Sequence, residues 1–348
     1  MDPVTQGLLG AAASCAGVGR RAPERVRPKL WWLGALGGMA ADLDILIRAP
    51  ADPMVALTFH RHFTHSISFI PFGGLLVALP FAMRAPADER KWIAAATTLG
   101  YATHALLDAF TSYGTLLWWP FSQTRVAWNT ISIIDPIYTG LLLIGVWMAR
   151  RRLTGGPAAL ALLASSSYMA FCGIVRAEVQ QAQARVLEAE GIVADARFTF
   201  PLLLANTRWR GLTVEGDRLH AHGFAKPWFG EVVYLPGEPV ARFDPELAPP
   251  AMFEGPGGQR VREALETLDW FAGKRLYIEE EGPGWWRVCD ARYSMKAAGF
   301  AGVFCWTLEP GRDDEPVRQQ SRSAGRRDGA DMRAMLPFGG SEDYRALP

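Results

Sequence analysis

The stretch "HRHFTHSISFIPFGGLLVALPFAM", His60 to Met83, sets a cluster of histidines directly before an apolar run. Three of the six histidines of the chain lie in its first seven residues, and the run from Ile67 to Met83 contains no charged side chain. A helix needs about 20 residues to cross the hydrocarbon core of a bilayer, so this run alone is marginal. The stretch predicts a membrane helix with imidazole groups at its polar end.

Further apolar segments flank this run on both sides. They are Val4–Val18, Leu30–Ile47, Trp92–Phe110, Ile131–Ala149 and Pro157–Val175. Several are near the lower length limit for a span, but together they indicate a bundle of membrane helices. We therefore expect a mainly α protein with a polytopic helical membrane domain over residues 1–175. For the short first segment, a full crossing and a half-span both remain open.

The composition separates this apolar half from a soluble one. The chain of 348 residues has a net charge of +1, and its mean hydropathy of +0.05 averages two unlike parts. Residues 176–348 carry most of the acidic residues and are typical of a water-soluble domain. The balanced charge gives no reason to expect nucleic acid as a partner. The N-terminus shows no basic region or cleavage site, so no signal peptide is predicted.

The basic residues predict how the helices are oriented. Eleven Lys and Arg residues lie in the connections 20–29, 84–91 and 150–152, whereas the alternating loops carry only three. Cytoplasmic loops of membrane proteins are enriched in these residues. The loops at 48–66 and 111–130, and the soluble C-terminal half, should then face the outside. We accordingly expect a multi-pass protein of the bacterial inner membrane with a periplasmic C-terminal domain.

The C-terminal half contains short alternating segments that predict strands. A helix is expected first, over Arg176–Glu190, and a second one over "REALETLDWFAG", ending at Gly273. These elements predict a small α+β periplasmic domain over residues 176–309 with an antiparallel sheet. The polar chain over residues 310–348 is rich in Arg, Asp and Gly and is expected to be disordered.

The four cysteines restrict the chemistry of the chain. They form no CxxC pair, so a zinc site built from thiolates is not expected. Cys289 and Cys305 would pair in an oxidising compartment, and two buried free thiols are the equally weighted alternative. His220 and His222 alternate in a strand-like segment, and we interpret them as surface residues because no carboxylate cluster accompanies them.

Ionisable residues attached to the apolar runs gather on the predicted outer side of the membrane. The orientation rests on Lys and Arg alone, yet every one of these residues falls on one side. They are Asp42, Asp44, His60, His62, His65, His104, Asp108 and Asp135. An ionisable residue within a span is costly and marks a functional site by default. The coincidence indicates a site at the outer face of the membrane.

Two of the carboxylate patterns are ambiguous when each is taken alone. His104 and Asp108, at positions i and i+4, share one face of a helix and can bind one metal ion, but a hydrogen bond that joins helices is the commoner explanation. Asp42 and Asp44 share no helical face, because two residues turn a helix by about 200°. Both can still reach one site from a helix end, and a polar stop to the span is the simpler explanation.

The histidine cluster strengthens the metal interpretation. His60, His62 and His65 follow no helical spacing, and imidazole with carboxylate ligands suits Zn²⁺, Mn²⁺ or Fe²⁺. The alternative is a group of interfacial histidines, one of which caps the next helix, a role that Thr64 or Ser66 can also fill. The whole set favours a divalent metal, zinc first. Because a metal with an open position activates water, hydrolysis is the predicted reaction class, and the number of metals stays open.

Several segments, taken in order, also match one family. They read "MDPVTQGLLGAA", "GGMAADLDIL", "HRHFTHS", "GYATHALLDAFTSYGT", "LLWWPFS" and "IIDPIY". They resemble the bacterial inner-membrane metal-dependent hydrolases typified by YdjM, from residue 1 to about 150, and "FPLLLANTRWRG" resembles the outer domain of longer members more weakly. The resemblance implies an integral membrane protein with a metal-dependent hydrolase site. The family is distantly similar to the zinc phospholipase C and P1 nuclease group, which implies a phosphoester substrate such as a lipid.

The resemblance also implies which residues form the site. It carries over Asp42, Asp44, His60, His65, His104 and Asp108 as metal ligands, with Asp44 and Asp108 as the candidate catalytic carboxylates. Gln6 stands where some members have His, and His62 stands where many have Gly. We therefore rank His62 below His60 and His65.

Three hypotheses remain at this point. The first is a membrane-bound hydrolase of a phosphoester that uses metal-activated water, with the lipid bilayer and a membrane-associated substrate as its partners. The second is a non-enzymatic protein whose cluster holds a structural or sensed metal and whose periplasmic domain binds a partner. The third, a transporter with His104 and Asp108 as an ion relay, is disfavoured because the chain shows no evident internal repeat.

Overall fold

The computed structural model describes residues 1–49, 52–204, 206–294, 296–320 and 344–348. Within these ranges the chain forms eight α-helices, and all of its named strands follow residue 195. The chain divides into two compact units, one of residues 1–46 and 59–173, the other of residues 47–58 and 174–348. The fold is thus mainly helical, with a sheet-containing C-terminal part.

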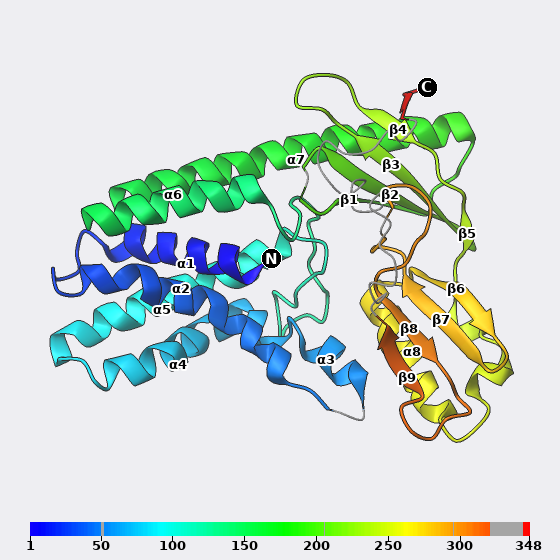
Figure 1. Ribbon diagram of the computed structural model, residues 1–348, viewed down its shortest axis with the longest axis horizontal. Coiled ribbons are helices and arrows are strands. Elements are labelled where there is room, and N and C mark those ends of the chain that lie inside the picture. Colours follow the sequence, from blue (N-terminus) through cyan, green and yellow to red (C-terminus); the bar gives the residue numbers. More distant parts are fainter. Residues whose placement is uncertain (50–51, 205, 295, 321–343) are drawn as a thin grey trace. The chain divides into compact units, whose positions relative to one another are not determined.

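The first unit is a bundle of helices (Figure 1). α1 packs against α2, α5 and α6, while α4 packs against α5. The helices are α1 (Pro3–Val18), α2 (Leu30–Ala40), α4 (Ile70–Ala82), α5 (Ala87–Ala109), α6 (Pro136–Arg152) and the first part of α7 (Gly156–Glu190). Short 3₁₀ segments join them, namely η1 (Arg27–Lys29), η2 (Ala41–Leu46), η3 (Phe63–His65) and η4 (Ile67–Phe69).

Glycine lets three of these helices approach backbone to backbone. A Cβ atom on Gly34 of α2 would lie 2.4 Å from the carbonyl oxygen of Gly10 in α1, and one on Gly100 of α5 would lie 2.1 Å from the oxygen of Gly34. Small residues permit such close contacts between membrane helices. The close approach brings the carbonyl oxygen of Gly38 within 2.5 Å of the His104 imidazole.

One helix among the described residues, α7, is long and apolar enough to cross a membrane by itself. The pair Pro53–His65 and Ile67–Ala82, bent by 61° at its break, meets the same criterion only when its two helices are counted together. The predicted helix Arg176–Glu190 is confirmed, and it is the continuous end of the 35-residue α7, which also contains the apolar segment Pro157–Val175. No proline interrupts the junction, and the Ala, Glu and Gln residues that follow are good helix formers.

The second unit contains two antiparallel sheets, where the sequence predicts one. The first joins, in order, β1 (Ala196–Pro201), β2 (Arg208–Glu215), β3 (Arg218–Ala225), β4 (Val233–Leu235) and β10 (Arg345–Ala346), with β5 (Val240–Ala241) on β3. The second joins β6 (Leu276–Gly282), β7 (Trp285–Asp290), β8 (Cys305–Leu308) and β9 (Val317–Gln320). The short helices are α3 (Pro53–Phe59), which falls in this unit except for its last residue, η5 (Pro245–Leu247) and η6 (Pro250–Phe253). The predicted helix is α8 (Gly258–Ala272), and it ends at Gly273 with a left-handed φ of 59°, as expected.

Part of the predicted disordered tail is ordered. Val317–Gln320 pair with β8, and Arg345–Ala346 pair with β4, so the prediction is wrong for these residues. Strand pairing satisfies their backbone groups despite their polar side chains. Residues 321–343 of the predicted tail lie outside the described residues.

The interpretation of His220 and His222 as surface residues is also wrong. Their exposed fractions are 7% and 2%, and their Nε2 atoms lie 2.9 Å from carboxylate oxygens of Glu215 and Glu190, respectively. Glu190 comes from the end of α7. The sequence offered no sign of this partner because the contact is made between distant segments.

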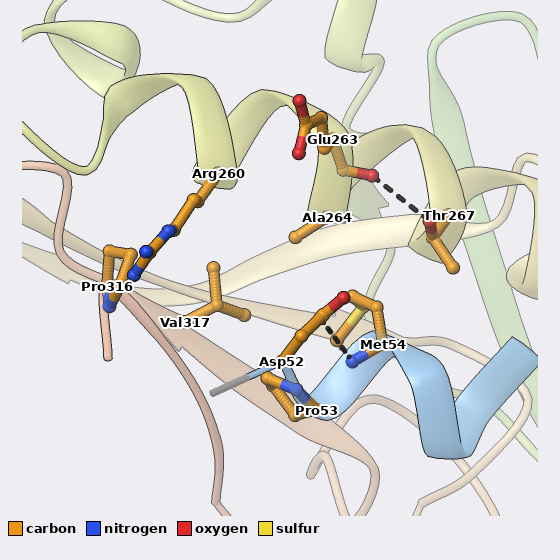
Figure 2. A pocket seen from close by; sticks show the side chains of 9 residues that line it. All are labelled: Asp52, Pro53, Met54, Arg260, Glu263, Ala264, Thr267, Pro316 and Val317. Carbon is orange, nitrogen blue, oxygen red and sulfur yellow. Dashed lines mark hydrogen bonds between the residues drawn. The ribbon is translucent and has the colours of Figure 1, made fainter. Parts of the chain in front are cut away.

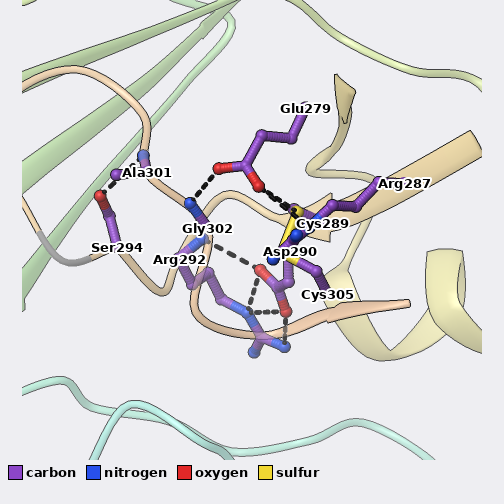
Figure 3. Close-up of a disulfide and its surroundings, with 9 residues drawn as sticks. All are labelled: Glu279, Arg287, Cys289, Asp290, Arg292, Ser294, Ala301, Gly302 and Cys305. Atoms are coloured by element: carbon purple, nitrogen blue, oxygen red, sulfur yellow. Dashed lines mark hydrogen bonds and ion pairs between the residues drawn. A yellow bond between two sulfur atoms is a disulfide. The ribbon is translucent and has the colours of Figure 1, made fainter. Parts of the chain in front are cut away.

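The two cysteines of the second unit form a disulfide, one of the two outcomes that the sequence left open (Figure 3). Cys289 of β7 and Cys305 of β8 face each other in the antiparallel register. Glu279 lies beside the disulfide, where it accepts a hydrogen bond from the backbone N–H of Gly302 at 2.6 Å and pairs with Arg287 at 3.0 Å. Cys15 and Cys172 of the first unit are buried and form no disulfide.

A cavity of about 250 Å³ lies beside α8 within the second unit (Figure 2). Its wall includes Glu263 and Thr267 of α8, together with Asp52 and Met54 at the start of α3. Asp52 accepts a hydrogen bond from the backbone N–H of Met54 at 2.9 Å, and Thr267 donates one to the backbone oxygen of Glu263 at 3.0 Å. These polar groups therefore serve local helix structure.

Candidate metal centre

Three separate segments of the first unit bring the predicted ligands together. η2 carries Asp42 and Asp44, the segment that ends in η3 carries the histidines, and α5 carries His104 and Asp108. The predicted ligands form two groups in which ligand atoms lie within 4.8 Å of one another, and Asp42 belongs to both. The first is Asp42, His65, His104 and Asp108, and the second is Asp42, Asp44 and His60.

His104 is held in one orientation by the backbone of α2. Its Nδ1 lies 2.5 Å from the carbonyl oxygen of Gly38, which can only accept, so Nδ1 carries the proton. The lone pair of Nε2 then faces the cluster, 3.3 Å from Asp42 Oδ1 and 2.9 Å from His65 Nε2. Metal-binding histidines commonly donate their second N–H to a carbonyl in this way.

His65 is oriented in the same sense by its own loop. Its Nδ1 lies 3.0 Å from Thr64 Oγ1 and 3.2 Å from Asp44 Oδ2. Because the Thr64 hydroxyl donates to Asp44 at 3.0 Å, both of these oxygens are acceptors toward the ring. Nδ1 therefore donates its proton, and the lone pair of Nε2 faces that of His104. Two facing lone pairs at 2.9 Å repel each other unless a cation or proton lies between them.

Asp108 presents a buried carboxylate oxygen to the same point. Its Oδ2 has no hydrogen-bond partner among the described residues, and it lies 3.3 Å from His65 Nε2 and 3.1 Å from Arg61 Nε. Its Oδ1 accepts a hydrogen bond from Gln6 Nε2 at 2.8 Å and contacts the α-amino group of Met1. This buried anionic oxygen is paired with the Arg61 guanidinium and also lies beside the histidine pair, a position that fits a bound cation.

Asp42 and Asp44 lie two residues apart in the 3₁₀ helix η2, and their side chains diverge, as expected of this spacing on a helix. The Asp42 side chain is 21% exposed and reaches both histidine Nε2 atoms. Asp44 is buried and organises the histidine loop instead. It contacts His60 Nδ1 at 2.8 Å and accepts from the backbone N–H of Arg61 at 2.9 Å.

Two residues of the site were not predicted from the sequence to take part in it. Arg61 adopts a left-handed φ of 61°, which aims its backbone N–H at Asp44 while its guanidinium reaches Asp108 and Thr111. Its position between two predicted histidine ligands was the one available hint. Gln6 is fully buried and donates a hydrogen bond from its Nε2 to Asp108 Oδ1.

Two residues on the predicted outer side lie apart from the cluster. The His62 ring contacts the aromatic rings of Phe59, Phe63 and Trp119. Asp135 caps α6, where its Oδ1 accepts from two backbone N–H groups at 3.0 Å and its Oδ2 accepts from Tyr168 at 2.9 Å. Both therefore have local structural roles.

The first unit is therefore a helical bundle whose His and Asp side chains form a candidate metal site. Residues 1–179 match the YdjM inner membrane protein family, and the chain belongs to that family. The matched region contains every residue of the cluster. At least one helix, α7, has the length and composition to cross the membrane.

The comparison with curated proteins gives a relative whose printed description names no activity. It is "Uncharacterized protein YfhP" from Bacillus subtilis (strain 168), which is 30% identical over 115 residues. The match covers 32% of this chain and 35% of the relative, so the chain spans about a third of the length of the curated relative it matches. No solved structure matches the chain.

Proposed function

We propose that this chain is a membrane-bound metal-dependent hydrolase of a phosphoester such as a lipid. The observation that carries the proposal is the pair of facing Nε2 lone pairs on His65 and His104, with the buried Oδ2 of Asp108 beside them. This donor set suits a divalent cation, zinc first and manganese or iron as alternatives. A bound ion of this kind would supply Lewis-acid activation of water and of the phosphoester.

The residues around the cluster have separable roles in this proposal. His65, His104 and Asp108 would hold the metal ion. The hydrogen bonds to the Gly38 carbonyl and the Thr64 hydroxyl orient the two imidazole rings. Asp42 is shared by both ligand groups, so a second ion position beside the first follows from the same geometry. Two adjacent ions favour phosphoester chemistry. The resemblance to the zinc phospholipase C and P1 nuclease group points to the same substrate class.

Proton transfer is assigned to Asp44 and its partner. Asp44 lies 2.8 Å from His60 Nδ1, and the His60 side chain is 24% exposed. The pair therefore connects the buried cluster to solvent and can hold a proton taken from water. Asp108, which is fully buried and paired with Arg61, is better placed to bind and to hold charge than to exchange protons with solvent.

We further propose a multi-pass arrangement in the inner membrane, with the C-terminal domain in the periplasm. The excess of basic residues in three connections supports the orientation. The disulfide between Cys289 and Cys305 supports the placement of the second unit, because such bonds persist in oxidising compartments.

A closed site without catalysis is the second candidate function. The side chains of His65, His104 and Asp108 are 0% exposed, which is typical of a structural or sensed metal with little access for water. Under this proposal the periplasmic domain would bind a partner, and the cluster would hold its metal without turnover.

One experiment tests both candidates on the full chain in detergent. Bound zinc, manganese and iron are measured by elemental analysis, and hydrolysis is measured with bis(p-nitrophenyl) phosphate and with short-chain phospholipids. The hydrolase proposal expects metal and turnover in the wild type, the loss of both in His104→Ala, and the retention of both in the matched control His62→Ala. Metal retained without any phosphoester hydrolysis would support the non-enzymatic candidate. If the protein holds no metal after reloading, both candidate functions are excluded.

A further inference from the structure

An apolar groove of about 480 Å³ runs between α6 and α7 within the first unit. Its walls include Ile144 and Met148 of α6, and Leu160 and Ala164 of α7. Small residues bring the two helices together beneath it, since a Cβ atom on Gly145 would lie 2.1 Å from the Cβ atom of Ala161. Its volume falls in the range of about 300–1,000 Å³ that is usual for small-molecule sites.

The walls of the groove are exposed and apolar. Leu160 is 67% exposed and Ile144 is 59% exposed. α7 is the described helix that can cross a membrane by itself, so this surface has the composition of one in contact with hydrocarbon. Acyl chains are therefore the natural neighbours of these side chains.

One end of the groove carries a cation. Arg152, the last residue of α6, lines the groove and has no hydrogen bond or ion pair with any part of the chain that the structure describes. Its neighbours Arg150 and Arg151 lie over the indole rings of Trp31 and Trp147, at 4.8 and 5.6 Å. Arg152 thus places one cation at the end of an apolar groove, and this combination complements the phosphate and the acyl chain of an anionic phospholipid.

We propose that this groove binds one acyl chain of an anionic phospholipid, with its phosphate on Arg152. The proposal does not depend on the metal centre. It commits to a lipid because the charged and apolar parts of the groove match the two ends of that molecule. Basic pockets between membrane helices bind anionic head groups in the same way.

Native mass spectrometry of the full chain in detergent tests the proposal. The protein is titrated with phosphatidylglycerol and with phosphatidylcholine of the same acyl chains, and retained lipid is counted. The wild type should retain phosphatidylglycerol in preference. Arg152→Gln should lose about fivefold in this preference, the value expected for one basic residue at an anionic surface. Ala164→Phe, which fills the groove and keeps the charge, should retain less of both lipids.

The matched control is Arg84→Gln, which removes one exposed charge from the end of a different helix. Circular dichroism of each variant establishes that it is folded. Equal retention of the two lipids by the wild type, or an equal loss in Arg84→Gln and Arg152→Gln, would overturn the proposal. Full displacement of the lipid by inorganic phosphate would also overturn the proposal, because the groove would then bind a free anion. A dimer that Ala164→Phe converts to a monomer would do the same, because the groove would then bind a second copy of the chain.

Discussion

His65 and His104 are separated by 39 residues, yet their Nε2 atoms lie 2.9 Å apart in a fully buried pair. Each ring uses its Nδ1 to donate to an oxygen outside the pair, so both facing nitrogens present lone pairs. Such an arrangement is unfavourable without a cation or a shared proton. Measurements of metal affinity in variants of the site distinguish a bound cation from a shared proton.

Removal of the His104 imidazole should abolish tight metal binding. We expect His104→Ala to weaken zinc affinity by more than about 100-fold, because partners beyond the ligands alone contribute about 10–100-fold. The affinity is measured by competition with a zinc chelator. His62→Ala is the control, since that ring packs among aromatic side chains outside the cluster. An equal and small effect in both variants would point to a shared proton.

Asp44→Asn should weaken metal binding although both histidine ligands remain. Asp44 accepts from the backbone N–H of Arg61 and from Thr64, and it lies beside the Nδ1 atoms of His60 and His65. An amide retains one acceptor and loses the charge, so we expect about 10–100-fold weaker metal binding and greater hydrogen exchange in residues 60–65. Asp135→Asn tests the loss of a comparable carboxylate outside the cluster. If Asp44→Asn binds metal like the wild type, the loop is not organised by this carboxylate.

Gln6 should increase the metal affinity of the site through its hydrogen bond to Asp108. Gln6→Leu removes the donor that lies 2.8 Å from Asp108 Oδ1, and we expect about 10-fold weaker metal affinity by isothermal titration calorimetry. Gln6→His should recover the affinity, because an imidazole N–H can donate to the same oxygen. Weak binding in both variants would show that the shape of Gln6, and not its hydrogen bond, supports the site.

The extent to which sequence predicts this structure depends on the range of the contacts. The HxxxD spacing predicts that His104 and Asp108 share a helix face, because that relation is local. The helix ending at Gly273 is predicted for the same reason. The divergence of Asp42 from Asp44 is likewise local, because two residues at this spacing share no helical face.

Contacts between distant segments explain what sequence patterns missed. Arg61 enters the site through a left-handed backbone conformation that only the packed loop determines. The partner of His222 comes from the end of α7, a helix whose continuity the change from apolar to polar residues concealed. Residue patterns and spacing predict neither the conformation of Arg61 nor the contact between His222 and Glu190.

Arg210 should be essential for the stability of the second unit. It is 1% exposed and donates hydrogen bonds to the backbone oxygens of Lys296, Ala297 and Gly299, at 3.2, 3.3 and 2.6 Å. Burial lowers the pKa of its guanidinium to about 10, so it is still charged at neutral pH. Arg210→Met would leave these oxygens unpaired, and we expect a loss of about 3 kcal/mol in the free energy of unfolding, measured with urea. Arg260→Met on the exposed face of α8 should change it by less than about 0.5 kcal/mol. A similar change in both would contradict the role of the buried hydrogen bonds.

The disulfide between Cys289 and Cys305 should be both stabilising and compartment-dependent. It closes a loop with a sequence separation of 16, for which loop-closure entropy gives about 3 kcal/mol. We expect the double variant Cys289→Ser and Cys305→Ser to unfold at lower urea concentration by that free energy, and reduction of the wild type to have the same effect. Cys172→Ser is the control, because that thiol is buried and forms no disulfide, and its loss should not alter the response to reductant. In intact cells, the two paired cysteines should react with maleimide only after reduction. If they react without a reductant, the second unit faces the cytoplasm, and the proposed orientation is wrong.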